Sequence, residues 1–445
     1  MPQNYNRLDK ASVLSFAKKI KDKSLREVCD ESILEHNYSG KGNFGQILEK
    51  YYFQYEPNSD SEADFSEINL ELKATPLKQL KNRHYRSKER LVLNIINYLE
   101  IVDQDFVNST FWKKNSNLLL IFYLHNFSQD ILDYVIKLVD EWNFPKNDLE
   151  IIKRDWEKIK KKIVDGNAHE LSEGDTLYLG ACTKGGKGGN ERTQPFNKKL
   201  AKQRAFSLKQ GYVNHIIATI ANNPGGNYGK LITSQTEIMK RSLEEIQVTL
   251  GANLNRSAKN FYASLTKLIL GIGPDQEIEE FEKADIIVKS IRLKENDFPK
   301  ENISFPNFKF EEIIKENWET SEFKNILEHK FLFVFYKYVD NSLVLRKVKF
   351  WNMPYRDILQ VEKVWTKAKN IIERGEIVNR IVGGIRYTNF PNKKFSNIAH
   401  VRPHATNSDD TYPLPIADKV TFAHDYTKHC FWLNNNYIRD EIYLK

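Results

Sequence analysis

Three ionisable residues, Asp64, Glu71 and Lys73, form a D-x6-E-x-K pattern inside a stretch that is otherwise typical of a β-strand. Side chains along a strand alternate between its faces, so Glu71 and Lys73 share a face while Leu72 points the other way. A hairpin or bend across the intervening residues would place Asp64 beside Glu71. Two carboxylates at a strand end form a hard-oxygen site that suits Mg²⁺, with a backbone carbonyl and waters as further ligands.

This set of groups suits phosphodiester hydrolysis. A metal held by Asp64 and Glu71 would offset charge in the transition state and lower the pKa of a bound water. The Lys73 ammonium would orient or polarise that water. The alternative interpretation is a solvated strand face with an ion pair between Glu71 and Lys73, which would add only roughly 0.5 kcal/mol of stability.

Two basic segments favour a polyanionic partner, in line with the net charge of +8. Residues 78–90 carry six Lys or Arg and one acid, and residues 184–209 carry eight and one. Each phosphate neutralised by such a segment releases counterions, so both are expected to be loops that grip a DNA backbone. A merely solvated basic face is the alternative. The expected contacts in the second segment are Lys184, Lys187, Arg204 and Lys209.

Short sequence blocks recur in the same order along the chain, which predicts two copies of one fold. The pairs are KSLREV (23–28) with RSLEEI (241–246), NFGQILEK (43–50) with NFYASLTK (260–267), WNFP (142–145) with WNMP (351–354), WEKIKKKIVDG (156–166) with WTKAKNIIERG (365–375), and FSLKQGY (206–212) with FWLNNNY (431–437). We predict a catalytic domain over residues 1–221, a turn-rich linker over residues 222–230, and a second domain over residues 231–445.

Each copy is expected to place helices before and after a central group of strands, which indicates a mixed α/β (α+β) layer architecture. In the first copy the expected helices are 12–35, 41–54 and 148–164, and the strands are 68–74, 118–124 and 134–139. In the second copy the expected strands are 284–293, 331–339 and 343–350, followed by a helix over 361–375.

The acidic pattern is not repeated in the second copy. The paired positions are Glu49 and Thr266, Asp64 and Glu280, Glu71 and Ile287, and Lys73 and Lys289. Glu280 alone cannot build a metal site, so only the first copy is expected to be catalytic. The joint loss of Glu49 and Glu71 indicates that these two acids act together.

These motifs resemble the MutH mismatch-repair nickase and its relatives, the Sau-family type II restriction endonucleases that cut at GATC. The family pattern is matched without a gap by Asp64, Glu71 and Lys73, and its preceding helix by KGNFGQILE, which ends on Glu49. The segments ELKATP, SKERLVLNIINY, DWE, IVDG and AHELSEG also match. The resemblance covers essentially the whole chain, and it implies two tandem copies of the PD-(D/E)XK endonuclease fold.

The resemblance also implies roles for single residues. Asp64 and Glu71 would bind Mg²⁺, and Lys73 would assist the attacking water. Glu49 would complete the acidic centre, and Lys114 matches an additional family lysine.

Base recognition in the nickase uses an R-P-K turn. The first copy has C-T-K at residues 182–184 and preserves only Lys184, whereas the second copy has Arg402, Pro403 and His404. The second copy resembles the non-cleaving DNA-binding domain of the restriction enzymes. Arg402 is expected to read guanine, because Arg to guanine is the commonest specific major-groove contact.

We therefore expect a Mg²⁺-dependent type II restriction endonuclease that cuts both strands of GATC-containing DNA. Expected partners are a cognate GATC methyltransferase, which protects the host genome, and a second copy of the enzyme on DNA. The alternatives are a methylation-directed repair nickase and a noncatalytic GATC-binding regulator. The fused second copy argues against the nickase, and the intact acid and lysine set argues against the regulator.

Patterns that the sequence lacks indicate where the protein acts and how its cysteines are used. The sequence has no run of about 18 apolar residues and no apolar stretch at its N-terminus, which favours a cytoplasmic protein without a membrane partner. Its three cysteines, Cys29, Cys182 and Cys430, lack the spacing of a zinc site or a disulfide framework.

Overall fold

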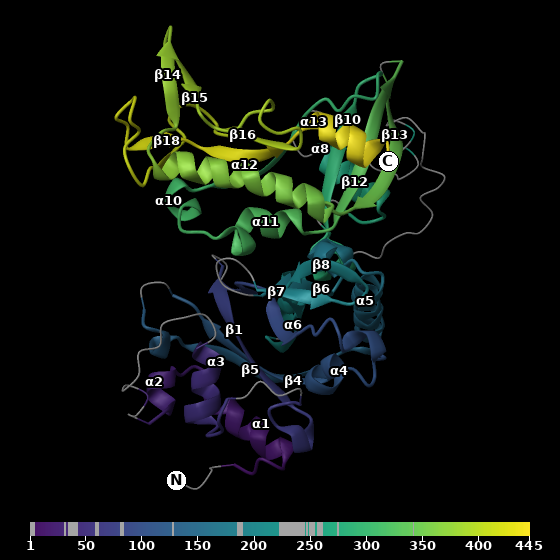
Figure 1. Ribbon diagram of the computed structural model, residues 1–445, viewed down its shortest axis with the longest axis vertical. Helices are drawn as coiled ribbons and strands as arrows, with labels where there is room; N and C mark the ends of the chain where they lie inside the picture. The colour runs from purple at the N-terminus through teal and green to yellow at the C-terminus, as the bar shows by residue number, and fades with distance from the viewer. Residues whose placement is uncertain are drawn as a thin grey trace. The chain divides into compact units, whose positions relative to one another are not determined.

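Contacts divide the chain into two compact units (Figure 1). A computed structural model describes residues 5–30, 33, 43–57, 62–80, 84–126, 129–184, 190–221, 245, 248, 254–255, 261–273, 276–340 and 342–445. The first unit is Met1–Gly226 with Glu279–Asp285, and the second is Asn227–Ile278 with Ile286–Lys445. The predicted linker over 222–230 and the expected DNA contact Lys187 lie outside the described residues.

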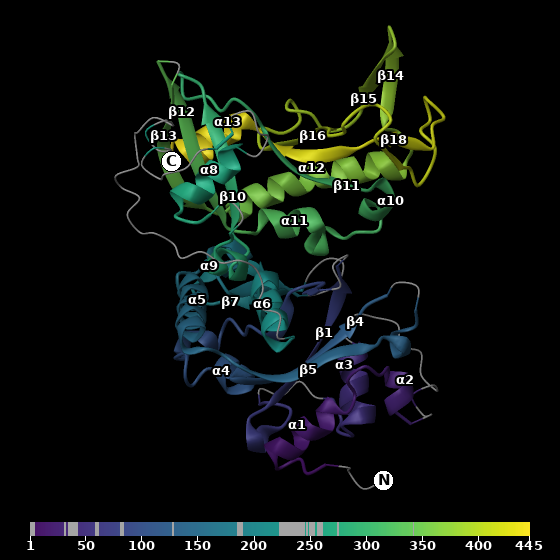
Figure 2. The ribbon, with the colours of Figure 1, turned by 180° about the vertical axis from the view of Figure 1, so that it is seen from behind.

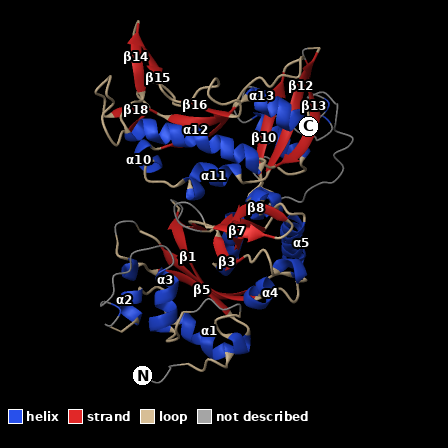
Figure 3. Cartoon of the chain, in the orientation of Figure 1, coloured by secondary structure: helices blue, strands red, loops and turns tan. Residues whose placement is uncertain are grey.

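Helices and strands alternate in the first unit (Figure 3). Its helices are α1 (Lys10–Lys18), α2 (Leu25–Val28), α3 (Asn43–Ile47), α4 (Thr110–Asn115), α5 (Lys146–Val164), α6 (Gln210–Ile220) and α9 (Glu279–Lys283), with the π-helix η2 (Leu48–Tyr52) continuing α3. Its strands are β1 (Glu71–Gln79), β2 (Tyr85–Ser87), β3 (Leu91–Ile95), β4 (Asn117–Leu124), β5 (Ile136–Asn143), β6 (Leu179–Thr183), β7 (Glu191–Gln194), β8 (Asn197–Lys202) and β9 (Arg204–Leu208).

A mixed sheet with strand order β2-β1-β4-β5 carries the candidate acids. Strand β1 runs parallel to β4, and β4 runs antiparallel to β5. The continuous apolar run of β4 matches its central place, because a strand covered on both faces need not alternate. On one face, Val13 of α1 and Ile47 of α3 share a core with Leu72 of β1 and Ile121 of β4. A second sheet has the order β3-β9-β6.

The second unit contains its own helices and strands. Its helices are α8 (Phe261–Ile269), α10 (Phe310–Ile313), α11 (Glu322–Leu327), α12 (Tyr355–Glu373) and α13 (Asn435–Tyr437), followed by the π-helix η10 (Ile438–Tyr443). Its strands are β10 (Ile287–Leu293), β11 (Ile303–Phe308), β12 (Phe331–Val339), β13 (Ser342–Trp351), β14 (Val378–Val382), β15 (Ile385–Thr388), β16 (Ala399–Pro403), β17 (Thr411–Pro413), β18 (Asp425–Thr427) and β19 (His429–Leu433).

Strand pairing in the second unit follows the arrangement of the first. Strand β10 runs parallel to β12, which runs antiparallel to β13, and a second sheet has the order β11-β19-β16. Ile287 pairs with Phe331 in the second unit where Glu71 pairs with Leu118 in the first. The predicted duplication requires this correspondence, and the common origin of the two units stays a prediction.

The long helices α5 and α12 have the same length and the same residue types at their ends. Each spans 19 residues, α5 after Pro145 and α12 after Pro354. Each is followed by a glycine with a left-handed backbone, Gly166 at φ 74° and Gly375 at φ 63°, a conformation that costs glycine little. Proline before the first turn and glycine after the last one therefore set both boundaries.

Two predictions of secondary structure were wrong. The helix expected over 12–35 ends at Lys18, and α2 starts only at Leu25. The chain turns between them because Asp22 adopts φ 62° and its amide bonds to the Ile136 carbonyl of β5 at 2.7 Å. The basic segment 184–209, expected to be a loop, instead forms β7, β8 and β9 in its described part. No helix in the described ranges is long and apolar enough to cross a membrane.

Candidate active site

A short local turn brings Asp64 back to the start of β1. Phe65 and Leu70 form a β-bridge around a 3-10 turn at Ser66–Ile68, with reciprocal backbone hydrogen bonds of 3.0 and 3.2 Å. Asn69 closes the turn at φ 50°, a left-handed conformation that asparagine tolerates. The D-x6-E spacing is therefore the length of one closed turn.

Asp64 and Glu71 are fixed to each other through the backbone. The Asp64 amide donates to Glu71 Oε2 at 3.0 Å, and the Leu72 amide donates to Asp64 Oδ2 at 3.0 Å. Both side chains are buried, at 9% and 1% exposure. Each carboxylate thus has one oxygen fixed by a main-chain donor, which restricts its rotation.

Two lysines offset the charge of Glu71. Lys73 Nζ lies 2.6 Å from Glu71 Oε1, and Lys114 Nζ lies 3.6 Å from the same oxygen. Lys114 also donates to the Glu62 carbonyl at 2.8 Å. The neighbouring Lys113 is exposed, whereas Lys114 is buried. The fold therefore places Lys114 beside Glu71, and the catalytic role of Lys114 stays a prediction.

Glu49 joins this acidic group from the π-helix η2. Burial, and next the Asp64 carboxylate, raise the pKa of Glu49 to about 7. Burial, and next the Glu71 carboxylate, raise the pKa of Asp64 to about 6, although Lys73 opposes this shift. Like charges close together disfavour the ionised forms of both groups. The three predicted acids, Glu49, Asp64 and Glu71, therefore lie close enough for their charges to interact.

These donors fit a hard divalent cation. Within the described part of the chain, no group of three or more His, Cys, Asp or Glu side chains has the geometry to hold a metal by itself. Mg²⁺ is ordinarily bound through one or two carboxylates and keeps several waters. Asp64 and Glu71 could supply those carboxylates. A cation beside them would also favour the charged form of Asp64 against the burial, and next the Glu71 carboxylate, that raise the pKa of Asp64.

Two supporting residues were missed by the sequence analysis. Arg7 Nη2 donates to the Asp64 carbonyl at 2.6 Å, and its guanidinium lies 5.0 Å from the Tyr55 ring centre. The buried Tyr55 hydroxyl has no hydrogen-bond partner among the described residues, and burial, Asp64 and Glu49 raise the pKa of Tyr55. No local pattern marks Arg7, because 57 residues separate it from Asp64.

The equivalent place in the second unit holds neutral hydroxyl groups. Thr266 Oγ1 lies 2.8 Å from Ser290 Oγ and 3.0 Å from the Tyr336 hydroxyl. Ile287 stands at the strand position of Glu71, and Glu280 is exposed on α9 within the first unit. A hydrogen-bonded hydroxyl cluster offers no carboxylate to a cation, so this place is not equipped for the same chemistry.

Two of the expected DNA contacts are buried, and the predictions for them were wrong. Arg204 is 1% exposed, and its Nη1 donates to the Ala181 carbonyl at 2.7 Å. Lys209 is 3% exposed and donates to the Thr176 carbonyl at 2.7 Å, and burial lowers the pKa of Lys209 to about 8. Both cations donate to carbonyl groups inside the fold. Arg204 lies on β9, the central strand of its sheet, and Lys209 follows that strand directly.

The remaining described candidates are exposed. Lys184 follows β6, and Arg402, Pro403 and His404 lie at the end of β16 or just after it. The Arg402 guanidinium stacks 3.9 Å from the ring centre of Trp432, and the His404 ring lies edge-on to the same indole at 5.3 Å. Trp432 was not among the residues predicted from the sequence, although it replaces Ser207 in the repeated block.

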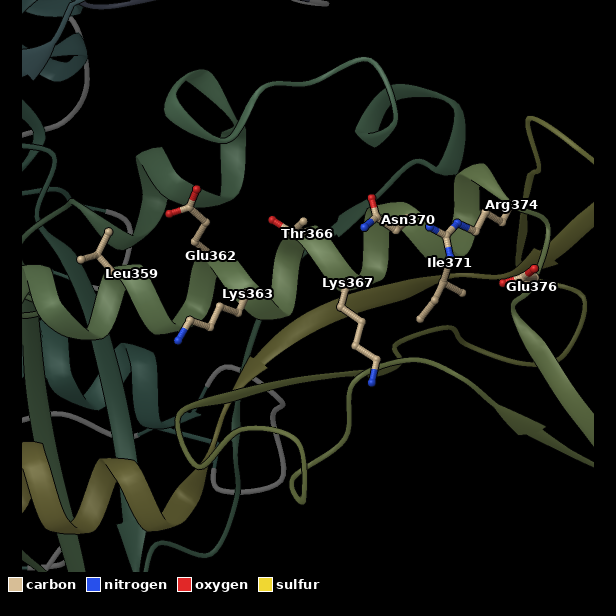
Figure 4. Close-up of a pocket in the computed structure, with 9 residues that line it drawn as sticks. All are labelled: Leu359, Glu362, Lys363, Thr366, Lys367, Asn370, Ile371, Arg374 and Glu376. Atoms are coloured by element: carbon tan, nitrogen blue, oxygen red, sulfur yellow. The ribbon is translucent and has the colours of Figure 1, made fainter. Parts of the chain in front are cut away.

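A separate hollow of about 720 Å³ is lined by residues of α12 and by Arg374 and Glu376, which follow this helix. Figure 4 shows Lys363 and Lys367 pointing to one side of the helix and Glu362 and Thr366 to the other. The side chains that line this hollow point away from one another along the helix and do not converge on a point. The hollow includes none of the acid and lysine set, which lies in the first unit.

Comparison with known proteins agrees with this arrangement. The family described as DNA mismatch repair enzyme MutH matches residues 53–155, a range that contains Asp64, Glu71, Lys73 and Lys114. The chain is also 34% identical over 473 residues to the type II restriction enzyme Sau3AI of Staphylococcus aureus, covering 94% of this chain and 96% of that protein. The chain belongs to the MutH-like type II restriction enzymes. Both units of this MutH-like enzyme fall within the compared length.

Proposed function

We propose that this MutH-like enzyme is a Mg²⁺-dependent restriction endonuclease that hydrolyses both strands of duplex DNA at GATC sites. One observation carries the proposal. The carboxylates of Asp64 and Glu71 are each held by a backbone amide at or beside the other residue, and Lys73 Nζ lies 2.6 Å from Glu71 Oε1. That set supports phosphodiester hydrolysis better than a structural ion pair. An ion pair alone would not need a third acid, Glu49, held in the same buried place.

The side chains divide the work between them. A bound Mg²⁺ would supply charge neutralisation at the scissile phosphate and a more acidic water. Asp64 and Glu71 would hold it, each through a carboxylate oriented by the backbone. Lys73 would orient the attacking water from the partly exposed side of Glu71. Lys114 would hold Glu71 in place through its contacts on the buried side.

We assign DNA binding without cleavage to the second unit. Its hydroxyl cluster around Thr266 lacks acids, whereas its exposed Arg402 lies over the Trp432 ring, which orients the guanidinium. An arginine ordered in this way loses less freedom on binding guanine. Lys184 of the first unit would add a backbone contact.

The biological setting follows from this activity. An enzyme that cuts both strands at GATC requires a cognate GATC methyltransferase to protect the host genome. It would act in the cytoplasm, where that genome lies, and dimerisation on DNA would place one catalytic unit on each strand.

Digestion of a plasmid of known sequence tests the proposal. With Mg²⁺ we expect linear fragments whose ends all map to GATC, and with EDTA we expect no cutting. Open circles without linear product would favour the repair nickase. Binding without any cutting, in several divalent metals, would favour the noncatalytic regulator.

A further inference from the structure

The second unit carries a protruding hairpin, β14–β15. Its strands pair from Val378 with Thr388 to Val382 with Ile385. Gly383 and Gly384 form the tip at φ 57° and 79°, the left-handed pair that a tight hairpin turn needs. Figures 1 and 2 show the hairpin extending from one end of the second unit, beyond α12 and β16.

The catalytic unit has no counterpart of this hairpin. It would fall between α5 and β6, where the described residues 165–178 contain only two 3-10 turns, Ala168–Glu170 and Glu173–Asp175. The core of the fold therefore does not need the hairpin. It is an addition to the unit that lacks the acids.

The tip of the hairpin is apolar and open to solvent. Ile381, Val382 and Ile385 are 48%, 55% and 62% exposed. Val382 and Ile385 pair across the turn on one face of the hairpin, and Ile381 lies on the other face. All three contribute little to the core of their own unit. Apolar side chains that are exposed on both faces of one hairpin tip indicate a contact with another molecule.

Charge identifies the class of that molecule. Residues 377–402 contain no Asp or Glu, and their cations are Arg380, Arg386, Lys393, Lys394 and Arg402. The Arg380 guanidinium lies 4.9 Å from the Tyr387 ring centre, and that of Arg386 lies 6.0 Å from the Tyr426 ring centre. The cations are thus held behind the apolar tip, in a run that ends at the proposed base reader. A polyanion complements this surface, and an acid-free run is poorly suited to a mixed-charge protein face.

We propose that the β14–β15 hairpin is a DNA-binding arm that contacts duplex DNA beside the recognition site. Arg380 and Arg386 neutralise backbone phosphates, and the aliphatic tip enters the adjacent groove. Apolar wedges flanked by cations are used in this way by other DNA-binding proteins. The inference rests on the proposed DNA binding by the second unit and adds a contact outside GATC.

The charge of the arm is tested by paired variants of the full-length chain. Arg380→Ala/Arg386→Ala is compared with Lys294→Ala/Lys300→Ala, which removes the same charge from exposed positions that follow β10, outside the hairpin. Affinity for a long GATC duplex is measured in Ca²⁺ by fluorescence anisotropy at several salt concentrations. Loss of two phosphate contacts should lower the salt slope by about 2 × 0.9, or ~1.8, which is roughly 30-fold weaker binding near 0.15 M salt. The control should change the slope much less.

The tip is tested separately. Ile381→Ser/Val382→Ser should weaken binding to a long duplex several-fold with an unchanged salt slope, and should not affect a duplex trimmed to the GATC site. In the unmodified enzyme, backbone amides of residues 380–387 should gain protection from hydrogen exchange when the long duplex is added, a readout that does not depend on any variant folding.

The proposal is overturned if the arginine variant behaves like the lysine control or if DNA gives these amides no protection. It is also overturned if the tip variant alters the oligomeric state of the enzyme in solution but not its affinity for DNA, since the hairpin would then contact protein. An unmodified enzyme with no preference for GATC would instead refute the proposed function.

Discussion

Replacing Lys114 by methionine separates catalysis from the general effect of charge, because the adjacent Lys113 provides a matched control. Lys114 is 9% exposed, donates to the Glu62 carbonyl at 2.8 Å and lies 3.6 Å from Glu71 Oε1. Methionine keeps most of the buried stem and removes the ammonium. Losing a hydrogen bond from a charged donor costs about 1.5–3 kcal/mol, and we expect the lower half of that range because Lys73 still pairs with Glu71.

The catalytic effect should be larger than the effect on stability. Lys114 is a preorganised cation beside a proposed metal ligand, and removing one such electrostatic group typically costs about 10²–10³ in rate. We therefore expect Lys114→Met to cut plasmid about a hundredfold more slowly or worse under single-turnover conditions. The exposed Lys113→Met should stay within about twofold in rate and about 0.5 kcal/mol in stability.

Three measurements complete the comparison: single-turnover cleavage in Mg²⁺, duplex affinity in Ca²⁺, and urea unfolding. If folded Lys114→Met enzyme cuts at the unmodified rate, Lys114 is only a support for the segment around Glu62. If both variants slow cleavage equally with weaker duplex affinity, long-range attraction of DNA explains the loss, and the site assignment of Lys114 is refuted.

Three further changes have defined outcomes. Glu71→Gln should abolish plasmid cleavage while duplex affinity in Ca²⁺ stays near normal, and rapid cutting by the folded variant would remove Glu71 from the site. Gly211→Ala should lower stability by about 1–3 kcal/mol in thermal unfolding, because the new Cβ would overlap the Glu282 carbonyl oxygen of α9. Gly45→Ala should be accepted without loss of stability, because its new Cβ would make only an ordinary contact of 3.9 Å with Glu49 Oε1. Burial lowers the pKa of His429 from 6.5 to about 4, so the unfolded chain binds more protons between these values. Stability of the second unit should be full above pH 6.5 and fall by about 3 kcal/mol as the pH drops towards 4, and His429→Gln should flatten that profile in urea unfolding.

Local sequence determined the parts of this protein whose geometry is closed within a few residues. The D-x6-E spacing predicts that Asp64 returns to Glu71, because one bridged turn and a left-handed Asn69 span that distance. The E-x-K spacing places Lys73 on the face of Glu71, because strand side chains repeat every two residues. The helices α5 and α12 and the strands β4 and β12 were predicted on the same basis, since period and end signals are local.

Tertiary structure decided which charged side chains are available for chemistry. Arg204 and Lys209 look like DNA contacts in sequence but donate to carbonyl groups inside the first unit. Arg7 reaches Asp64 across 57 residues, and α9 packs in the first unit although the chain around it belongs to the second. Whether a cation faces solvent, an acid or a carbonyl depends on segments far away in the chain, and that dependence is invisible to any local pattern.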